Sequence, residues 1–254
     1  MASSERFGYE WDTFSEMTPI YEEQFWKWVS PLTKKDFAGK SVLDAGCGMG
    51  RNAYWTAKAG AKEVVAFDLD DRSIAAAKKN LQKFPQTRVE KYSFYEIPFQ
   101  DQFDIAFSIG VIHHLENPNL ALQKMKMAVK PGGKVLIWVY GYEGNEWIVR
   151  LVSPVRKLIT SRLPIWLLNY LTYFVSVPLW LLVKILPTKN TYLRQLKEFK
   201  LWHIHSICFD QLLPRIANYY RKDEARKLLV DVGLQNVEIY PCNGNSWTVI
   251  GVKR

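Results

Sequence analysis

The chain has 254 residues, enough for one large α/β domain or for one domain that carries an insertion. Apolar residues make up 48% and charged residues 23%, a balance that excludes intrinsic disorder and predicts a packed core. Cys47, Cys208 and Cys242 lie far apart without CxxC spacing, which argues against a disulfide framework or a zinc site and fits a reducing compartment. The first ten residues lack the apolar region of a signal peptide, so a cytoplasmic location is expected.

The formal net charge of +9 is concentrated in one part of the chain. From Arg150 to Lys200 there are nine Lys or Arg residues and a single acidic residue, Glu198, so the remainder is close to neutral. A basic stretch of this kind can meet the phosphates of lipid or of nucleic acid. It can also simply keep an otherwise apolar segment soluble.

Residues 1–37 are expected to form a helical cap before the first strand. Residues 19–29 carry the pattern of a short amphipathic helix, with Thr18 as its N-cap. The aromatic residues in front of this helix fit either a lid over a ligand site or ordinary core packing, and both interpretations stay open. They are Tyr9, Trp11 and Phe14.

From residue 40 onward, short apolar runs alternate with helical stretches. Continuous apolar strands that alternate with helices are typical of parallel strands covered on both faces. Residues 131–133 (Pro-Gly-Gly) are expected to make the turn before the last strand of this series. The predicted strands are 41–45, 63–68, 87–92, 103–109 and 134–140, and the predicted helices are about 51–59, 72–83 and 119–129.

The alternation stops at residue 141 and resumes near residue 222. A helix at about 223–232 is followed by strands at about 235–240 and 246–252, which a tight connection pairs as a hairpin. The predicted fold is α/β, a Rossmann-like mixed sheet of seven strands, six parallel and one antiparallel. Its core comprises residues 38–140 and 222–254, and residues 141–221 form a helical insertion after the fifth strand.

A glycine-rich turn follows the first predicted strand and opens a helix: Asp44-Ala-Gly46-Cys-Gly48-Met-Gly50-Arg51. Glycines let the backbone turn sharply and let a ligand lie against it, and strand ends of this kind bind ligands in open α/β sheets. A dinucleotide site would need a small residue where this chain has Arg51. The spacing behind the acid Asp44 suits a cationic sulfonium amino acid, S-adenosylmethionine (SAM), better than NAD.

Asp68 ends the second predicted strand, twenty-four residues after Asp44. A carboxylate at this position can accept hydrogen bonds from both hydroxyls of a ribose. The alternative role of a helix cap suits Asp70 or Asp71 better. The pattern therefore indicates a nucleoside-containing ligand.

Four segments, taken together, resemble the class I SAM-dependent methyltransferases in order and spacing. The resemblance is strongest to the group that includes ubiquinone/menaquinone-pathway and glycan-modifying enzymes, and it covers about residues 38–140 and 222–253. These motifs are specific for the superfamily but give almost no information about the substrate. The segments are VLDAGCGMGR, VVAFDLD, FDIAFSIGVIHHLENP and VKPGGKVLIWVY.

The resemblance implies SAM as cofactor, with Asp68 on the ribose and Leu69 on the adenine. Ser93 and Phe94 fall where family members place an Asp and a small residue beside adenine. A hydroxyl accepts more weakly than a carboxylate, so the Ser93 side-chain contact is in doubt, while a backbone contact at Phe94 would survive. The residues implied at the methionine end are Asp44, Gly46, Cys47, Gly48, Ser108 and Ile109, with Arg51 near the rim.

Two adjacent histidines, His113 and His114, lie at the carboxyl end of the fourth predicted strand. A general base helps methyl transfer to a hydroxyl. SIGVIHHL resembles a segment of cyclopropane and mycolic-acid methyltransferases in which the residue matching His113 faces the active site, which implies His113 rather than His114 as base or substrate anchor. Two structural histidines are the alternative. His203 and His205 lack further ligands, so no metal site is expected.

The insertion contains a run of twenty-one residues without charge, 163–183, nominally enough to span a bilayer. A single crossing is excluded because strands before and after the run belong to one predicted sheet, and Pro164 and Pro178 should interrupt a continuous helix. A polar stripe among bulky apolar residues, flanked by basic residues, predicts an interfacial helical hairpin on anionic lipid. An active-site lid and a homodimer interface are the alternatives. The stripe is Asn169, Thr172 and Ser176.

We therefore expect a SAM-dependent methyltransferase (EC 2.1.1) for a hydrophobic or lipid-linked small-molecule or glycan acceptor, with oxygen as the first candidate atom and carbon the next. It would be cytoplasmic and peripheral at the inner membrane surface. A non-catalytic SAM-binding protein and an RNA methyltransferase are the alternatives. A nucleic-acid partner is disfavoured because a long uncharged run separates the basic clusters. Neither the identity of the acceptor nor the oligomeric state follows from the sequence.

Overall fold

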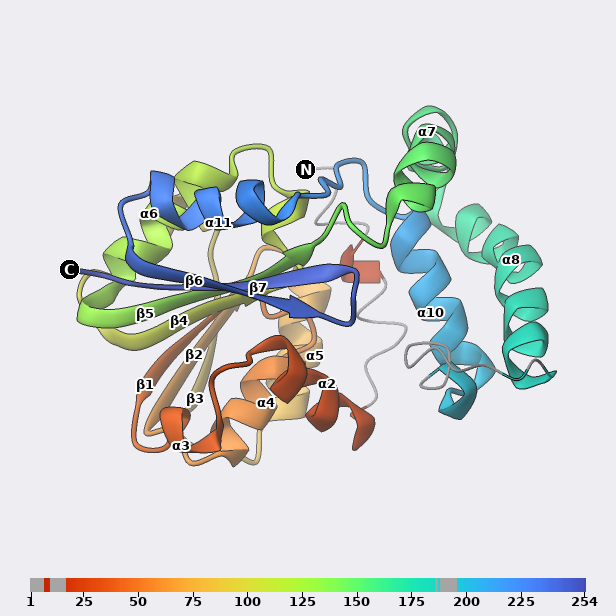
Figure 1. Ribbon diagram of the computed structural model, residues 1–254. Coiled ribbons are helices and arrows are strands. Elements are labelled where there is room, and N and C mark those ends of the chain that lie inside the picture. Colours follow the sequence, from red (N-terminus) through yellow and green to blue (C-terminus); the bar gives the residue numbers. More distant parts are fainter. Residues whose placement is uncertain (1–6, 10–16, 186, 188–195) are drawn as a thin grey trace.

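The computed structural model describes residues 7–9, 17–185, 187 and 196–254. Its centre is one seven-stranded sheet in the order β3-β2-β1-β4-β5-β7-β6 (Figure 1). Strand β7 runs antiparallel to both β5 and β6, and the other pairs are parallel, so the predicted mixed sheet is confirmed. The strands are β1 (Ser41–Ala45), β2 (Glu63–Asp68), β3 (Thr87–Lys91), β4 (Phe103–Ile109), β5 (Val129–Tyr140), β6 (Gln235–Cys242) and β7 (Ser246–Val252).

Helices cover both faces of this sheet, which explains why its central strands are apolar at nearly every position. Successive side chains of a strand point to opposite faces, so Val42 joins one hydrophobic core and Leu43 the other. The core around Leu43 lies under α6 (Pro118–Ala128) and α11 (Lys222–Asp231). The opposite core lies under α2 (Ile20–Trp28), α3 (Lys34–Phe37), α4 (Arg51–Lys58) and α5 (Asp71–Leu81).

The predicted turn at 131–133 is wrong, because these residues belong to β5. The pairing of β5 with β4 shifts register between Phe103 and Ile105, which marks a β-bulge rather than a break in the strand. Gly132 has φ 79°, and a Cβ on Gly133 would lie 2.8 Å from the carbonyl oxygen of Lys130. The Pro-Gly-Gly segment is thus absorbed into the strand as an irregularity.

The N-terminal segment also differs from its predicted details. Pro19, not Thr18, occupies the N-cap of α2, and no side chain caps this helix. Tyr9 lies beside Phe209, with ring centroids 6.2 Å apart. Trp11 and Phe14, the other two residues of the predicted lid or core cluster, lie outside the described residues.

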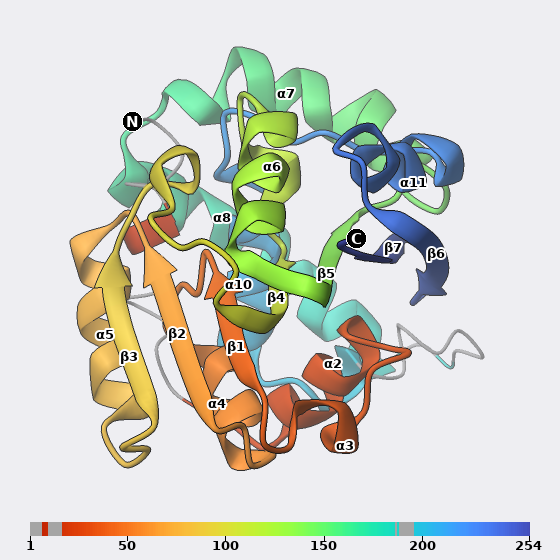
Figure 2. The same ribbon diagram turned by 90° about the vertical axis from the view of Figure 1, so that its left-hand side faces the viewer.

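Between β5 and α11 the chain leaves the sheet and builds a group of helices beside the carboxyl ends of the parallel strands (Figure 1). Figure 2 shows β3, β2 and β1 next to one another, with the helices of this insertion beyond them. The helices are η3 (Ile148–Val152), α7 (Ser153–Leu158), η4 (Thr160–Arg162), α8 (Ile165–Ile185) and α10 (Leu201–Leu212).

Helix α8 corrects the predicted helical hairpin within residues 163–183. It is continuous and keeps Pro178 inside, where the ring removes only the backbone hydrogen bond to residue 174. Pro164 precedes the helix, and its carbonyl accepts from the amide of Leu168. By length and composition α8 could cross a membrane. A single crossing would nevertheless separate β5 from β7, which pair along their length in one sheet.

Candidate functional site

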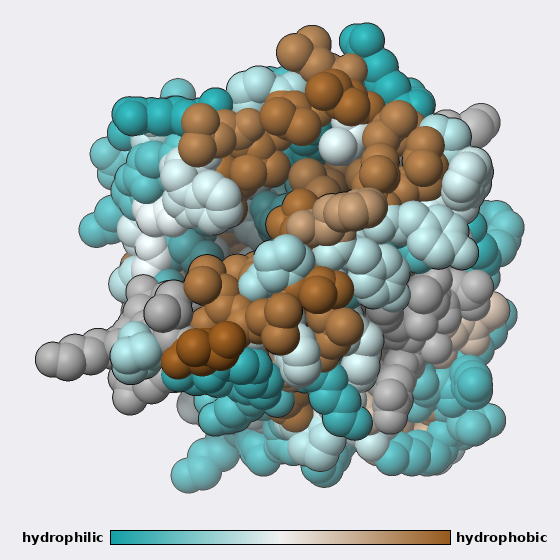
Figure 3. All heavy atoms as spheres, turned by 90° about the vertical axis from the view of Figure 1, so that its right-hand side faces the viewer, coloured by the Kyte–Doolittle hydropathy of each residue, from teal (hydrophilic) through white to brown (hydrophobic). Residues whose placement is uncertain are grey.

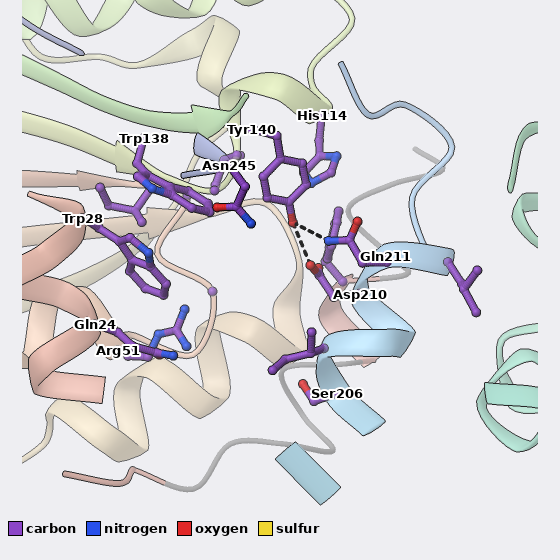
Figure 4. Close-up of a pocket in the computed structure, with 18 of the residues that line it drawn as sticks. Gln24, Trp28, Arg51, His114, Trp138, Tyr140, Ser206, Asp210, Gln211 and Asn245 are labelled. Atoms are coloured by element: carbon purple, nitrogen blue, oxygen red, sulfur yellow. Dashed lines mark hydrogen bonds between the residues drawn. The ribbon is translucent and has the colours of Figure 1, made fainter. Parts of the chain in front are cut away.

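A cavity of about 1100 Å³ lies between the glycine-rich turn of the core and the insertion (Figure 4). It exceeds the usual range of small-molecule sites, about 300–1,000 Å³. Its walls come from the ends of β1, β2, β4 and β5, from α2, and from η3, α7, α8 and α10 of the insertion. The cavity therefore has room for a nucleoside-sized ligand together with part of a second molecule.

The turn after β1 is held by the neighbouring strand. The backbone amides of Gly46 and Cys47 both donate to the carbonyl of Phe67, each at 2.9 Å. Gly46 has φ 74°, and a Cβ there would lie 2.8 Å from Val111 and 3.0 Å from Phe94. Only glycine keeps the backbone in this conformation and leaves this part of the cavity open.

Asp44 is a buried carboxylate at the end of β1. Neither of its oxygens meets a donor at hydrogen-bond geometry among the described residues, although the amide of Ala53 lies close enough to favour the ionised form. Burial, together with the negative charge of Asp68, raises the pKa of Asp44 to about 8. A buried carboxylate without a partner favours a cationic ligand nearby, so the part of the cavity beside the glycine-rich turn fits the amino acid portion of SAM better than a diphosphate.

Asp68 presents a second carboxylate at the end of β2. Its Oδ2 accepts from the amide of Gly48 at 2.9 Å, and its Oδ1 accepts from the amides of Leu69 and Asp70 at 2.8 and 3.2 Å. Burial raises the pKa of Asp68, and these three amides counteract the effect. A carboxylate has about four acceptor positions, so about one remains for a hydroxyl of a ligand.

Ser93 and Phe94 lie where the resemblance placed the adenine. The hydroxyl of Ser93 accepts from the amide of Tyr95 at 3.2 Å and caps a short helix, η1 (Phe94–Glu96), so a backbone group already uses it. Asp44 and Ser108 are fully buried and do not line the cavity. The predicted cofactor residues that line it are Gly46, Cys47, Gly48, Arg51, Asp68, Leu69, Ser93, Phe94 and Ile109.

The two adjacent histidines have different surroundings. His113 is fully buried, does not line the cavity and packs against the ring of Tyr140 at 3.9 Å. His114 lines the cavity, and its Nδ1 lies 2.6 Å from the carbonyl of Ile216, which requires a proton on Nδ1. Burial lowers the pKa of both, to about 4 for His114. The structure thus brings His114 rather than His113 to the cavity.

The insertion contributes a polar cluster that the sequence analysis missed (Figure 4). Tyr140 donates to Oδ2 of Asp210 at 2.8 Å and accepts from Nε2 of Gln211 at 3.2 Å. The hydroxyl of Tyr219 donates to Oε1 of Gln211 at 3.2 Å. One signal was present in the sequence, because Asp210 is the only acidic residue between positions 199 and 222.

Arg156 of α7 lies behind this cluster and is almost completely buried. Its guanidinium donates to the carbonyl of Gln211 at 3.3 Å and to the hydroxyl of Ser153 at 3.1 Å. Burial raises the pKa of Asp210, while the hydrogen bond from Tyr140 and the positive charges of Arg51 and Arg156 oppose the rise. The cluster thus holds a desolvated carboxylate at the boundary between core and insertion.

Comparisons with known proteins support the assignment of SAM as the cofactor of this site. A family model described as a methyltransferase domain matches residues 43–137. A tRNA U34 carboxymethyltransferase of Idiomarina loihiensis is 31% identical over 133 residues, which are 50% of this chain and 41% of that protein. A ubiquinone biosynthesis O-methyltransferase of Acinetobacter baumannii is 26% identical over 165 residues, 56% of this chain and 65% of that protein. The chain thus spans less than half of the first relative.

The fold has a counterpart of matching length among solved structures. A SAM-dependent methyltransferase from Aquifex aeolicus superposes with a TM-score of 0.55 at 16% identity. The alignment covers 94% of this chain and all of the other protein. At this identity the likeness concerns the fold, and it is the family model whose matched residues include the glycine-rich turn.

Proposed function

We propose, from the premise that the chain belongs to the class I SAM-dependent methyltransferase superfamily, that it methylates an oxygen atom of a hydrophobic or lipid-linked acceptor. The observation that carries the proposal is the composition of this cavity. One end is lined by the glycine-rich turn and Asp68, with Asp44 buried beside the turn, and the other is an apolar chamber under the insertion. The cluster of Asp210, Tyr140 and Gln211 supplies polar groups to that chamber.

The core residues bind and orient the cofactor. SAM supplies a methyl carbon that is already activated by the positive sulfur. Asp44 offers a buried negative charge to the cationic end, Gly46 leaves space against Val111 and Phe94, and Asp68 accepts from the ribose. With the carbon activated, the remaining task of the chain is to position an acceptor and to exclude water.

The chamber selects an apolar acceptor. The side chains that line it from η3, α7 and α8 are aliphatic, and its polar groups come mainly from α10, so most of an acceptor is bound by burial of its apolar surface. The apolar residues from the insertion include Leu151, Val155, Leu179, Leu196, Ile207 and Leu212.

Asp210 is the group we assign to the acceptor hydroxyl. Its Oδ2 is held by Tyr140, whereas its Oδ1 has no hydrogen bond to a described residue, so Oδ1 can accept the proton of the hydroxyl. Burial raises the pKa of Asp210 and lowers that of His114 to about 4, which makes the carboxylate a better base than an ordinary one and the imidazole a poorer one. His113 remains a predicted base, and its contact with Tyr140 suits a residue that positions the phenol.

The test is methylation of 4-dodecylcatechol, a hydrophobic hydroxyl probe, with SAM labelled in its methyl group. We expect O-methylated product, identified by mass spectrometry, and less product from catechol, which lacks the alkyl chain. Asp210→Asn should abolish turnover and leave the calorimetric affinity for SAM unchanged, whereas Asp223→Asn on the surface of α11 should alter neither. Transfer to carbon, or SAM binding without transfer to either probe, would contradict the proposal.

RNA modification is the second candidate function, because the Idiomarina loihiensis relative is named a tRNA U34 carboxymethyltransferase and this chain carries a net charge of +9. Against it, large apolar side chains outnumber basic ones among the exposed side chains of the insertion that the structure describes. Total tRNA is therefore a third substrate in the same assay. Incorporation of label into tRNA and not into the alkylated probe would favour this function over ours.

A further inference from the structure

Helix α8 has its polar and apolar sides reversed relative to an ordinary surface helix. Thr172 and Ser176, of the predicted polar stripe, are fully buried against the rest of the insertion. Ser176 Oγ lies 3.0 Å from Nδ1 of His205 on α10, and Nε2 of His205 lies 2.9 Å from the amide oxygen of Asn169. The polar residues are thus used inside the protein, and the outward side of α8 is left apolar.

The outward side of α8 is continuous with apolar side chains of η3 and α7. Phe174 is 80% exposed and Leu151 is 68% exposed, values that are uncommon for side chains of this size in a soluble protein. Figure 3 looks onto this side of the molecule, where apolar side chains gather around a hollow. We call this surface the insertion face, defined by Trp147, Leu151, Leu158, Trp166, Tyr170 and Phe174.

The cavity reaches the surface on this same side. Trp147, Leu151, Val155 and Val175 line the cavity and are also exposed to solvent, so they form the rim of its opening. The rim joins η3 and α7 on one side with α8 on the other. An apolar molecule could pass from the environment of the insertion face into the chamber without crossing water.

The charged residues of the segment that carries the insertion face are basic. The sequence from Trp147 to Lys197 contains no acidic residue. Arg150, Lys157 and Lys184 are exposed beside the apolar side chains. Apolar side chains accompanied mainly by positive charge match the interface of a bilayer that contains anionic lipids, where the apolar groups enter the acyl region and the cations meet phosphates.

We propose that the insertion face docks on the surface of an anionic lipid bilayer. Trp166, Tyr170 and Phe174 of α8 and Leu151 of η3 enter the interface, and the opening of the cavity then faces lipid. The helix lies along the surface, since the sheet that contains both β5 and β7 keeps the chain on one side of the membrane. The docking does not depend on the proposed function. Only the entry of an acceptor through the opening rests on that function.

Co-sedimentation of the full chain with vesicles tests this proposal. We expect the protein to bind vesicles of phosphatidylcholine and phosphatidylglycerol at low salt, and to bind pure phosphatidylcholine vesicles several-fold more weakly. Phe174→Asp and Leu151→Asp should each lower the partition coefficient about tenfold, because a charge must then enter the interface. The controls Met127→Asp and Val230→Asp, at apolar side chains that are 46% and 41% exposed away from the insertion, should bind like the native chain.

Calorimetry with SAM separates this test from that of the proposed function, because every variant should bind SAM like the native chain if it is folded. A native chain that stays in the supernatant with anionic vesicles while binding SAM would overturn the proposal. So would equal binding by Phe174→Asp and the native chain. The native chain could instead form a dimer on gel filtration that Phe174→Asp converts into a monomer, with neither protein binding vesicles. That result would assign the insertion face to a second copy of the chain and would likewise overturn the proposal.

Discussion

Tyr140, the last residue of β5, donates a 2.8 Å hydrogen bond to Oδ2 of Asp210, which lies seventy residues later on α10 (Figure 4). This bond joins the sheet that carries the glycine-rich turn to the insertion that encloses the apolar chamber. It fixes one oxygen of the carboxylate and leaves the other for a ligand. The orientation of Asp210 therefore depends on an element of the core.

Tyr140→Phe should lower turnover of the alkylated catechol probe by about tenfold to a hundredfold, because Asp210 loses the donor that orients it. The calorimetric affinity for SAM should not change, since Tyr140 contributes to the acceptor side of the cavity. Tyr240→Phe, which removes a hydroxyl near the surface, is the matched control and should leave turnover at the native level. A loss of SAM affinity in Tyr140→Phe equal to the loss of turnover would show a role in the cofactor site instead.

Asp44→Asn should abolish SAM binding and yet stabilise the fold at alkaline pH. The pKa of Asp44 is about 8 in the folded chain and 3.8 in an ordinary setting, so the folded state keeps a proton between these values that the unfolded state has released. Native stability therefore falls as pH rises from about 4 to about 8, and Asn removes this loss. We expect no difference in unfolding free energy near pH 4 and a gain on the order of a few kcal/mol at pH 9.

Thermal and urea unfolding of both proteins across this pH range are the measurements. A variant that is less stable than the native chain at pH 9 would show that Asp44 makes a stabilising contact in the absence of ligand. That result would remove the basis for treating its carboxylate as a site for a cation.

SAM binding near pH 7 should release close to one proton. Asp44 is largely protonated at that pH in the free chain, and a cationic group beside it favours the ionised form. The affinity for SAM should therefore rise with pH and level off above about 8, which is the pKa of Asp44 in the ligand-free chain. Calorimetry in two buffers of different ionisation enthalpy measures the released protons, and proton uptake on binding would contradict the assignment.

Gly46→Ala and Gly39→Ala form a matched pair at the same backbone conformation. Both glycines have positive φ, 74° and 71°, so the backbone strain alone should cost each variant about 1–2 kcal/mol of stability. A Cβ at position 39 meets nothing within 4 Å, whereas one at position 46 lies 2.8 Å from Val111. Only Gly46→Ala should lower SAM affinity, by more than tenfold, and equal affinities in the two variants would place the ligand elsewhere.

Arg156→Met should destabilise the insertion without altering SAM affinity. Its guanidinium donates to the carbonyl of Gln211 and to Ser153, and leaving a buried acceptor without its donor costs about 1–3 kcal/mol. Faster proteolytic cleavage within residues 141–221 and a lower melting temperature are the expected results. Arg150→Met, at an exposed position of the same segment, should behave like the native chain. An unchanged cleavage rate in Arg156→Met would refute this structural role.

Local sequence patterns were enough to predict the strands of the sheet, the position of the insertion in the chain and the residues at the cofactor end of the cavity. These depend on local rules: apolar runs form strands, and glycines at fixed spacing make the turn after β1. The positions of Gly46 and Asp68 therefore follow from the strands β1 and β2, at whose carboxyl ends they lie. The Pro-Gly-Gly bulge departs from these rules because Val129 and Lys134 on either side of it pair with β4, and Gly132 and Gly133 hydrogen-bond to Lys253.

Which side chains reach the acceptor end of the cavity depends on tertiary packing. A short helical turn, η2 (Ile112–His114), directs His114 toward the cavity and buries His113, a choice that adjacent identical residues do not reveal. Asp210 reaches Tyr140 through the packing of α10 against the core, across a sequence separation that no local pattern spans. The polar stripe of α8 was visible in the sequence, but periodicity shows only that a helix has two sides. Which side turns inward was decided by His205 on α10, whose ring nitrogens bond that stripe.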